Sequence, residues 1–347
     1  MDLTIGELFP ERSMTALPEL KSELGFPFDK VVVTGGAGSI GAVVVRTLIE
    51  CTDAEVWIID NDESRLHSIF HSFFEDQKLR IHFYVTDIRD LEGLHLRLNV
   101  IKPDVIVHAA ALKHVSILEV QVRDAFYTNV IGTQNLIKFL ESNPGVGMVF
   151  VSSDKAANAK SILGKTKLIG ELLVGSLIKA DRENGISRFL SVVRFGNVFL
   201  SRGSVLETFI KQIHLGEPIT ITDERMSRYF MDIKEAAGLI THVMNSKTFG
   251  ISIFKMGEPI MIIDLASRLQ NYFKAQNREI RLIGSVSGEK LHEDLFSFEE
   301  LSHARDLGLI YNTEKIGFLP DADWSNLPRD DFEAKQLIQS IISLSLK

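Results

Sequence analysis

The sequence has a single cysteine, no long apolar run and no excess of positive charge. Because Cys51 stands alone among 347 residues, the chain can form neither an intramolecular disulfide nor a cysteine-ligated metal cluster. No apolar stretch approaches the ~18 residues that a membrane-spanning helix needs. The first residues, MDLTIGELFPERS, lack the basic start and apolar core of a signal peptide. These absences predict a cytoplasmic protein without a membrane span.

The net charge of −8 argues against a general surface for nucleic acid or anionic membranes. It is compatible with a local basic pocket for a phosphorylated ligand. The ten histidines show no metal-ligand spacing such as His-Glu-x-x-His, so we expect no bound metal. At 347 residues, with 45% hydrophobic content, the chain can bury a substantial core in one large domain or two interlocked ones.

From Lys30 onward, short β-branched runs alternate with longer amphipathic stretches. Strands are expected at residues 31–34, 54–60, 80–85, 105–109, 148–152 and 189–194, and helices at 40–50, 63–75, 91–99, 125–142 and 163–184. This alternation predicts βαβ units, with helices on both faces of a parallel sheet. The expected fold class is α/β: a Rossmann-like, doubly wound parallel sheet with a smaller, interleaved substrate-binding region.

A glycine-rich segment at residues 34–41, TGGAGSIG, follows the first expected strand and opens the first helix. Gly35 permits a tight turn, Gly38 lets the backbone approach a pyrophosphate, and Gly41 lets the helix pack closely on the strand. The pyrophosphate would lie against the positive end of the helix. This context predicts a dinucleotide site.

Two acidic residues follow later strands of the same predicted unit. Asp60 ends the second strand, near the offset expected of a carboxylate that binds ribose, and it favours NAD over NADP. Arg65 lies nearby and weakens that preference. Asp87, after the third strand, could accept a hydrogen bond from the adenine amine, cap the helix before Leu91, or do both.

The predicted domain boundaries follow the point at which the alternation weakens, after Arg194. Residues 1–29 form an N-terminal arm to which the sequence assigns no firm structure. Residues 30–200 form the NAD-binding domain, whose sheet is completed by about 229–256. Residues 201–228 and 257–347 form the substrate-binding region. The ligands would bind between the two, over the carboxyl ends of the strands.

An acid and a base stand side by side where the fifth strand ends, in Ser153-Asp154-Lys155. An enzyme that only moves hydride needs no such pair. An enzyme that also eliminates water does, because one group must take a carbon-bound proton while another protonates the departing hydroxyl. The tripeptide therefore indicates a sugar dehydratase.

These motifs together resemble the extended short-chain dehydrogenase/reductase superfamily. Within it, the chain resembles the polysaccharide-biosynthesis branch, specifically the inverting UDP-N-acetylglucosamine 4,6-dehydratases. The resemblance spans most of the chain, in the family's order, over residues 34–41, 108–115, 128–133, 152–158, 193–198, 201–205, 226–231 and 288–293.

The resemblance implies oxidation of the sugar C4 hydroxyl, loss of water across C5 and C6, and return of the hydride to C6. The product would be a 4-keto-6-deoxy sugar. Asp154 would protonate the departing C6 oxygen, and Lys155 would remove the C5 proton. Lysine at this position marks the C5-inverting branch. A lysine base must be neutral, which requires burial or a nearby cation.

Lys167 matches the lysine of the family's Tyr-x-x-x-Lys motif, where it would bond the nicotinamide ribose. Leu163 stands in place of the tyrosine, so C4 oxidation needs another base. Ser153 could contact the C4 hydroxyl and pass its proton to Asp154 or to water.

The remaining site residues also follow from the resemblance. NAD would be held by Gly35, Gly38, Ser39, Ile40, Gly41, Asp60, Asp87, Ile88, Ala109, Ala110, Ala111, Asn129 and Lys167. The substrate, a UDP-linked sugar, would contact Lys113, Asn197, Arg228 and Lys290. His108 and His114 are expected to be structural, and Phe70, Phe73, Phe74 and Phe83 to lie in the core.

The helices expected at 125–142 and 163–184 resemble those that pair between subunits in this superfamily, which predicts a homo-oligomer. Two other functions stay open. A nucleotide-sugar epimerase, acting at C4 or C5, would not need both Asp154 and Lys155. A catalytically silent nucleotide-sugar-binding protein would explain Leu163, but it would have no need of the retained acid, base and lysine.

Overall fold

The expected strands assemble into one large sheet. The computed structural model describes residues 3–11, 26–285, 287–319 and 326–345. Seven strands run parallel in the order β3-β2-β1-β4-β5-β6-β11. They are β1 (Lys30–Thr34), β2 (Glu55–Asp60), β3 (Ile81–Val85), β4 (Val105–His108), β5 (Gly147–Val151), β6 (Leu190–Arg194) and β11 (Gly250–Phe254).

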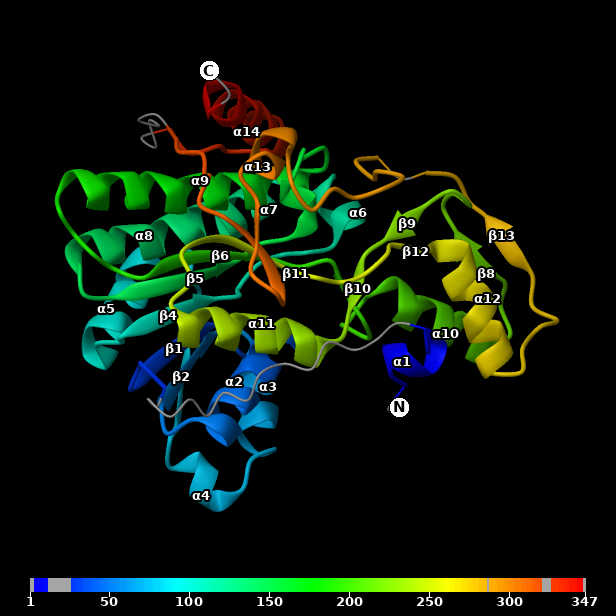
Figure 1. Cartoon of the computed structure of the whole chain (residues 1–347), viewed down its shortest axis with the longest axis horizontal. Coiled ribbons are helices and arrows are strands. Elements are labelled where there is room, and N and C mark those ends of the chain that lie inside the picture. Colours follow the sequence, from blue (N-terminus) through cyan, green and yellow to red (C-terminus); the bar gives the residue numbers. More distant parts are fainter. Residues whose placement is uncertain (1–2, 12–25, 286, 320–325, 346–347) are drawn as a thin grey trace.

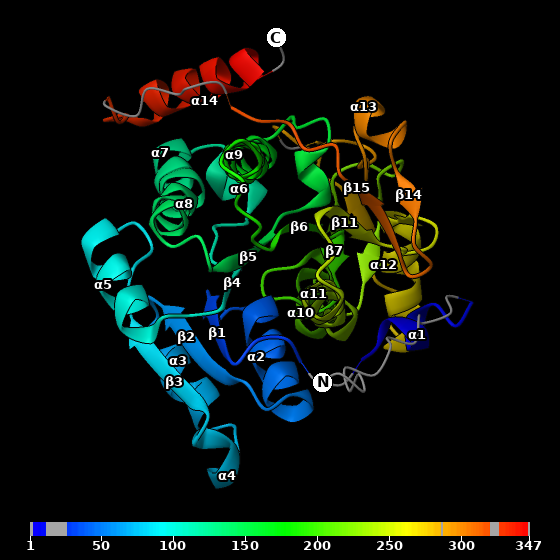
Figure 2. The same cartoon turned by 60° about the vertical axis from the view of Figure 1, so that its left-hand side comes forward.

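Helices cover both faces of this sheet (Figure 2). One face carries α2 (Ser39–Cys51), α3 (Glu63–Phe70) and α11 (Ile233–Ser246), and the other carries α5 (Leu91–Ile101), α8 (Gly132–Ser142) and α9 (Ile162–Glu183). The central strands β1, β4 and β5 are mostly apolar, and all of their residues except Lys30 are buried, as two covered faces require. The predicted α/β fold class, with its doubly wound sheet, is confirmed.

The expected helix at 125–142 is longer and contains a wider turn. It begins with α7 (Val122–Ala125), continues as a π-helical turn η1 (Phe126–Ile131) and ends as α8. Such turns occur frequently at functional sites, and this one carries Asn129.

Among the described residues, no helix combines the length and the apolar character needed to cross a membrane.

The C-terminal part of the chain differs from the predicted boundaries. Strand β15 (Ile310–Thr313) pairs antiparallel with β11, and β14 (Arg305–Asp306) extends the sheet further. Helix α14 (Asp331–Ser345) packs on α7 and α9. Residues 257–347 are therefore not all outside the main sheet. An exposed edge at β11 would leave backbone groups unpaired, and β15 covers it.

The expected completion of the sheet by residues 229–256 holds for β11 alone. Strand β10 (Phe230–Met231) pairs instead with β7 (Asn197–Val198) in a separate ribbon. Helix α14 packs on α7 and α9, which belong to the two helical segments through which a homo-oligomer was expected.

A second, smaller hydrophobic core lies beside the sheet (Figure 1). It is built from α10 (Val205–Leu215), α12 (Ile262–Tyr272) and two short ribbons. One ribbon joins β8 (Ile219–Ile221) to β13 (Ile280–Leu282), and the other joins β9 (Ser227–Arg228) to β12 (Ile260–Met261).

Part of the N-terminal arm has a definite structure. Helix α1 (Ile5–Leu8) buries Ile5 and Leu8 in the second core. Arg268 holds it from α12 by donating to the Leu8 carbonyl at 2.7 Å and pairing with Glu11 at 2.7 Å. The rest of the predicted arm includes residues 12–25, which lie outside the described residues.

The predicted aromatic core is partly wrong. Phe73 is buried and Phe70 is partly buried, but Phe74 is 77% exposed and Phe83 is 44% exposed. The expected helix at 63–75 ends at Phe70, and a turn separates it from α4 (Glu75–Lys78). Phe83 lies on β3, an edge strand, where fewer neighbours are available to cover it.

Arg194, at the end of β6, joins three separate parts of the chain. Its guanidinium is 1% exposed and pairs with Glu171 of α9 at 2.6 Å and with Glu300 of α13 (Phe298–Leu301) at 2.7 Å. Ser152 also donates to Glu171, at 2.5 Å. Burial disfavours the charged guanidinium, but the two carboxylates outweigh it and raise the pKa of Arg194.

Glu171→Ala is expected to destabilise the fold by about 3–5 kcal/mol, because it leaves the buried guanidinium of Arg194 without one of its two carboxylates. Equilibrium unfolding in urea measures this loss. Glu50→Ala is the matched control. It removes the exposed pair between Arg46 and Glu50 and is expected to cost at most about 1 kcal/mol. Equal losses would contradict the proposed importance of the Arg194 network.

Candidate active site

The glycine-rich turn between β1 and α2 is closely packed against the end of β4. Gly35 has a φ of +67°, and a Cβ there would lie 2.6 Å from the backbone of Ala110. A Cβ on Gly41 would lie 2.2 Å from the Gly35 carbonyl oxygen. Helix α2 begins after Gly38, and no side chain caps its N-terminus. The turn therefore fits a bound pyrophosphate, which could accept from the uncapped amides.

The two predicted acidic ligands of the cofactor already have protein partners. Asp60 accepts from the Ala37 amide at 3.0 Å and thereby fastens the glycine turn to β2. Asp87 pairs with Arg89 at 2.6 Å; burial raises the pKa of Asp87, but the bonds from Arg89 outweigh it and lower the pKa overall. The alternative role of Asp87 as a helix cap is wrong, because Asp90 caps α5 by accepting from the Gly93 amide.

The other predicted cofactor residues lie on three segments: Ala109, Ala110 and Ala111 directly after β4, Asn129 on η1, and Ile88 before α5. Asn129 is buried and holds Leu112, accepting from its amide at 2.8 Å and donating to its carbonyl at 3.0 Å. It thus fixes the segment that contains Ala109, Ala110 and Ala111. Ile88 is buried against Gly132.

The segment that contains Arg202 lies next to the glycine turn, and the charges of Arg202 and Arg65 act on Lys113. The backbone amide of Arg202 donates to Ser39, which begins α2. Desolvation lowers the pKa of Lys113, with Glu207 opposing the change and Arg202 and Arg65 adding to it. The sequence predicted only Lys113 as a substrate ligand. Arg202 was missed, although it lies in segment 201–205, one of the segments that match the family. Cations such as these suit a diphosphate.

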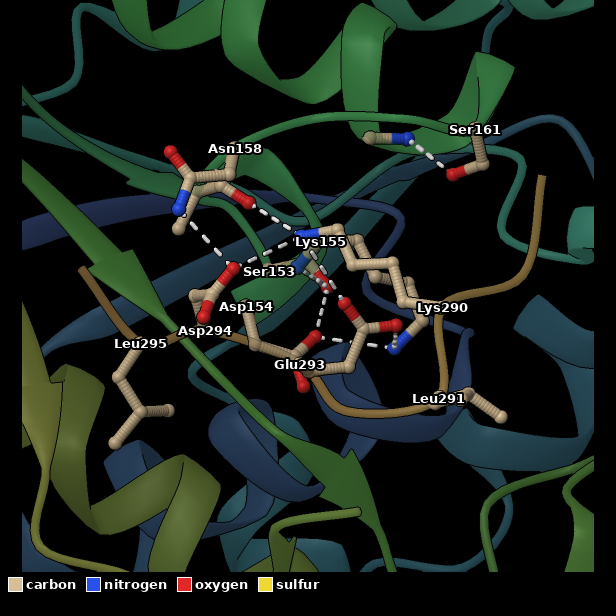
Figure 3. Close-up of polar contacts among 12 residues, drawn as sticks. Ser153, Asp154, Lys155, Asn158, Ser161, Lys290, Leu291, Glu293, Asp294 and Leu295 are labelled. Carbon is tan, nitrogen blue, oxygen red and sulfur yellow. Dashed lines mark hydrogen bonds and ion pairs between the residues drawn. The ribbon is translucent and has the colours of Figure 1, made fainter. Parts of the chain in front are cut away.

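The acid and base predicted from the sequence are in direct contact (Figure 3). They lie on a 3-10 turn, η2 (Asp154–Ala156), whose first amides Ser153 caps. Lys155 Nζ lies 3.0 Å from Asp154 Oδ1 and 3.2 Å from Asn197 Oδ1. Ser153 Oγ donates to the same Asp154 oxygen at 2.9 Å. Asp154 is fully buried, and its Oδ2 has no hydrogen-bond partner among the described residues.

The segment around residues 288–294 closes over this turn. Lys290 Nζ donates to the Ala157 carbonyl at 2.8 Å and lies 3.6 Å from Glu293 Oε2. Glu293 Oε1 lies 3.7 Å from Lys155 Nζ. Sequence reasoning named Lys290 but missed Glu293. The sequence contained a signal for Glu293, because it is the last residue of the matching segment 288–293. Only the fold, however, brings its carboxylate close to Lys155.

Lys167 lies on α9, behind the turn η2. Its ammonium donates to the Val151 carbonyl at 2.8 Å and lies 5.0 Å from the ring centre of Phe150. Burial lowers the pKa of Lys167 to about 8, although Glu171 acts in the opposite direction. Leu163 is 5% exposed and packs in the main core, so the side chain at this position supplies no proton-transfer group.

His108 has the surroundings of a structural histidine. Its two ring nitrogens bond the hydroxyls of Thr34 and Thr133 at 2.8 and 2.9 Å. Burial, with a smaller effect of Lys167, lowers the pKa of His108 to about 3. The ring is therefore neutral at physiological pH.

Arg228 is buried beneath the closing segment. Its guanidinium donates to the Ser227 carbonyl at 2.7 Å and to the Leu291 carbonyl at 3.1 Å. The structure thus gathers Ser153, Asp154, Lys155, Asn197 and Lys290, and links Arg228 to them through the backbone of residue 291. Lys113 lies with the other group of residues, at the glycine turn.

Gly35→Ala is expected to weaken dinucleotide binding by at least about tenfold. A side chain at this positive φ would be strained, and its Cβ would overlap the Ala110 backbone. Titration with NADH, followed by fluorescence, measures the affinity. Gly145→Ala is the control, since a Cβ there meets nothing within 4 Å. Unchanged affinity in Gly35→Ala would contradict the assignment of this turn.

A family model described as "Polysaccharide biosynthesis protein" matches residues 31–315. The probable polysaccharide biosynthesis protein EpsC of Bacillus subtilis is 35% identical over 309 residues, which cover 87% of this chain and 50% of EpsC. The chain therefore spans about half the length of that relative. A UDP-glucose 4-epimerase of Rickettsia canadensis is 33% identical over 292 residues, covering 83% of each chain.

Solved structures show the same fold. The X-ray structure of Pen from Bacillus thuringiensis is 30% identical, with a TM-score of 0.76, covering 91% of this chain and 97% of Pen. Two epimerases and a 4,6-dehydratase, each solved with NAD, are 21–22% identical with TM-scores of 0.64–0.67 and share the fold alone. The match over residues 31–315, with the identities above, confirms the resemblance, and the chain belongs to the polysaccharide biosynthesis protein family of extended short-chain dehydrogenase/reductases.

Proposed function

We propose that this chain is an NAD-dependent, C5-inverting nucleotide-sugar 4,6-dehydratase that acts on a UDP-N-acetylhexosamine. The contact between buried Asp154 and Lys155 carries the proposal. It provides an acid and a base 3.0 Å apart at the carboxyl end of β5, where ligands bind in doubly wound folds.

The cofactor would be held by the turn containing Gly35, Gly38 and Gly41 and by Lys167. When bound, NAD would accept hydride from C4 and give it back at C6. Asp60 supports NAD over NADP because its carboxylate repels a 2′-phosphate. The cations Lys113 and Arg202 would hold diphosphate, and Asn197, Arg228 and Lys290 would contact the nucleotide sugar.

One proton shared by Asp154 and Lys155 can set up the elimination. Lys155 donates to Asp154 Oδ1. Transfer of that proton leaves a neutral amine and a protonated acid, the two forms that the reaction needs. Lys155 then takes the C5 proton while Asp154 protonates the C6 oxygen, and water leaves. The ammonium and the carboxylate are restored at the end of the step.

The unpartnered Asp154 Oδ2 supports this assignment. A buried carboxylate oxygen without a hydrogen bond is costly, and a substrate hydroxyl would satisfy it. For the C4 proton, which the side chain of Leu163 cannot take, Ser153 offers a hydroxyl beside Asp154. Because Asp154 takes its proton from Lys155, Ser153 Oγ would accept the C4 proton while passing its own to water.

A nucleotide-sugar epimerase is the second candidate, and the relative named UDP-glucose 4-epimerase favours it. An epimerase acting at C4 oxidises and reduces the same carbon, so it loses no oxygen from C6. It would leave the buried acid Asp154 without a leaving group to protonate. The presence of both acid and base therefore supports the dehydratase over the epimerase.

Incubation with UDP-N-acetylglucosamine in deuterated water, followed by NMR, is expected to yield a 4-keto-6-deoxy sugar carrying deuterium at C5. The deuterium enters because Lys155 exchanges its proton with solvent before C5 regains one. The C5 configuration reports inversion. A new hexose that keeps its C6 hydroxyl would show epimerisation instead. Binding without turnover of this or other nucleotide sugars would indicate a silent binding protein.

Lys155→Ala is expected to lower the dehydration rate by roughly 10²–10⁴-fold, the usual contribution of a general base. Initial rates measured by the same NMR assay test this. Lys160→Ala, an exposed lysine five residues further along, is the control and should keep the full rate. Full activity in Lys155→Ala would refute the assignment of the base, without touching the reaction class.

A further inference from the structure

We propose that Glu293 is a positioning residue of the elimination: it holds the Lys155 amine in place beside Asp154 and governs whether that amine carries a proton. The proposal rests on the proposed dehydratase function, and it adds a residue from a distant segment to the machinery. Figure 3 shows Glu293 beside Lys155 and Lys290.

Glu293 is a buried acid whose contacts all lie within the site. Its side chain is 4% exposed. One oxygen lies 3.7 Å from Lys155 Nζ, and the other lies 3.6 Å from Lys290 Nζ. That second oxygen, Oε2, has no hydrogen bond to any described residue. A buried carboxylate that serves the fold alone would be expected to have its oxygens hydrogen-bonded.

The three N–H bonds of the Lys155 ammonium have three oxygen acceptors nearby, from three parts of the chain. Asp154 Oδ1 and Asn197 Oδ1 lie within hydrogen-bond distance, and Glu293 Oε1 lies at ion-pair distance, 3.7 Å. The charged lysine is therefore held in one orientation. Once Asp154 takes a proton, Asn197 can still accept from the neutral amine, so that its lone pair can face the substrate.

Several charged or titratable groups surround Lys155, and the effect of Glu293 on its protonation must be separated from theirs. Burial raises the pKa of the Tyr229 phenol, with added effects of Glu258, Asp294 and Asp154. The charged or titratable groups that face Lys155 and its partners are Asp154 on η2, Lys167 on α9, Tyr229 between β9 and β10, and Lys290, Glu293 and Asp294 on the closing segment. Of the carboxylates on the closing segment, Glu293 alone pairs with Lys155.

The test is the pH dependence of Lys155 acetylation by acetic anhydride in the substrate-free protein, measured by mass spectrometry. Only a neutral amine reacts. In Glu293→Gln, loss of one adjacent negative charge is expected to shift the reactive range of Lys155 down by about one pH unit. The acidic limb of the dehydration rate should shift in the same direction.

Asp294→Asn is the matched control. It removes the same charge from the neighbouring residue, which pairs with Lys290 at 3.5 Å but does not pair with Lys155. Its shift is expected to be under about 0.3 pH unit, since Asp294 is half-exposed and screened. Equal shifts in both variants, or none in Glu293→Gln, would overturn the proposal.

If Glu293→Gln does not fold, Lys290→Gln tests the same geometry with the opposite sign. It removes the cation that neutralises Glu293, so the reactive range of Lys155 should move to higher pH; an unchanged range would again overturn the proposal. Because acetylation is read without substrate, a shift in a protein that performs no dehydration would refute the proposed function while supporting the contact between Glu293 and Lys155.

Discussion

The buried guanidinium of Arg194 is the constraint on which the site depends. It binds Glu171 of the long helix α9 and Glu300 beside the closing segment, and Glu171 in turn accepts from Ser152, just before the turn η2. A buried cation of this kind is stable only while its carboxylates are in place. The end of β5, helix α9 and the segment before α13 are therefore held in one arrangement.

That arrangement explains why two acids and two lysines can share a small buried volume. Asp154 and Lys155 come from the turn after β5, while Lys290 and Glu293 come from a segment more than 130 residues later. Each lysine lies within 4 Å of a carboxylate, so the charges compensate one another away from water. Asp154 Oδ2 and Glu293 Oε2 are left without hydrogen bonds, which is a state suited to receiving a substrate.

Prediction from sequence was reliable where local pattern and burial agree. Strands β1, β4 and β5 are mostly apolar, because both of their faces are covered, and the glycine turn has positive φ at Gly35. Prediction failed where the local sequence was compatible with more than one cap residue or more than one helix end. Asp87 and Asp90 both precede α5, and only the backbone geometry selects Asp90 as its cap. Phe74 follows the end of a helix whose length the periodicity overestimated.

The sequence by itself determined the fold class, the dinucleotide turn and the adjacent acid and base, because each depends on residues close together in the chain. Tertiary structure alone decided that β15 completes the sheet and that Glu293 reaches Lys155. It also decided that Asn197 shares the Lys155 ammonium with Asp154. The physical reason is common to all three. A strand edge or a buried charge in the folded chain finds its partner among residues that are far away in sequence. The spacing of neighbouring residues therefore cannot predict that partner.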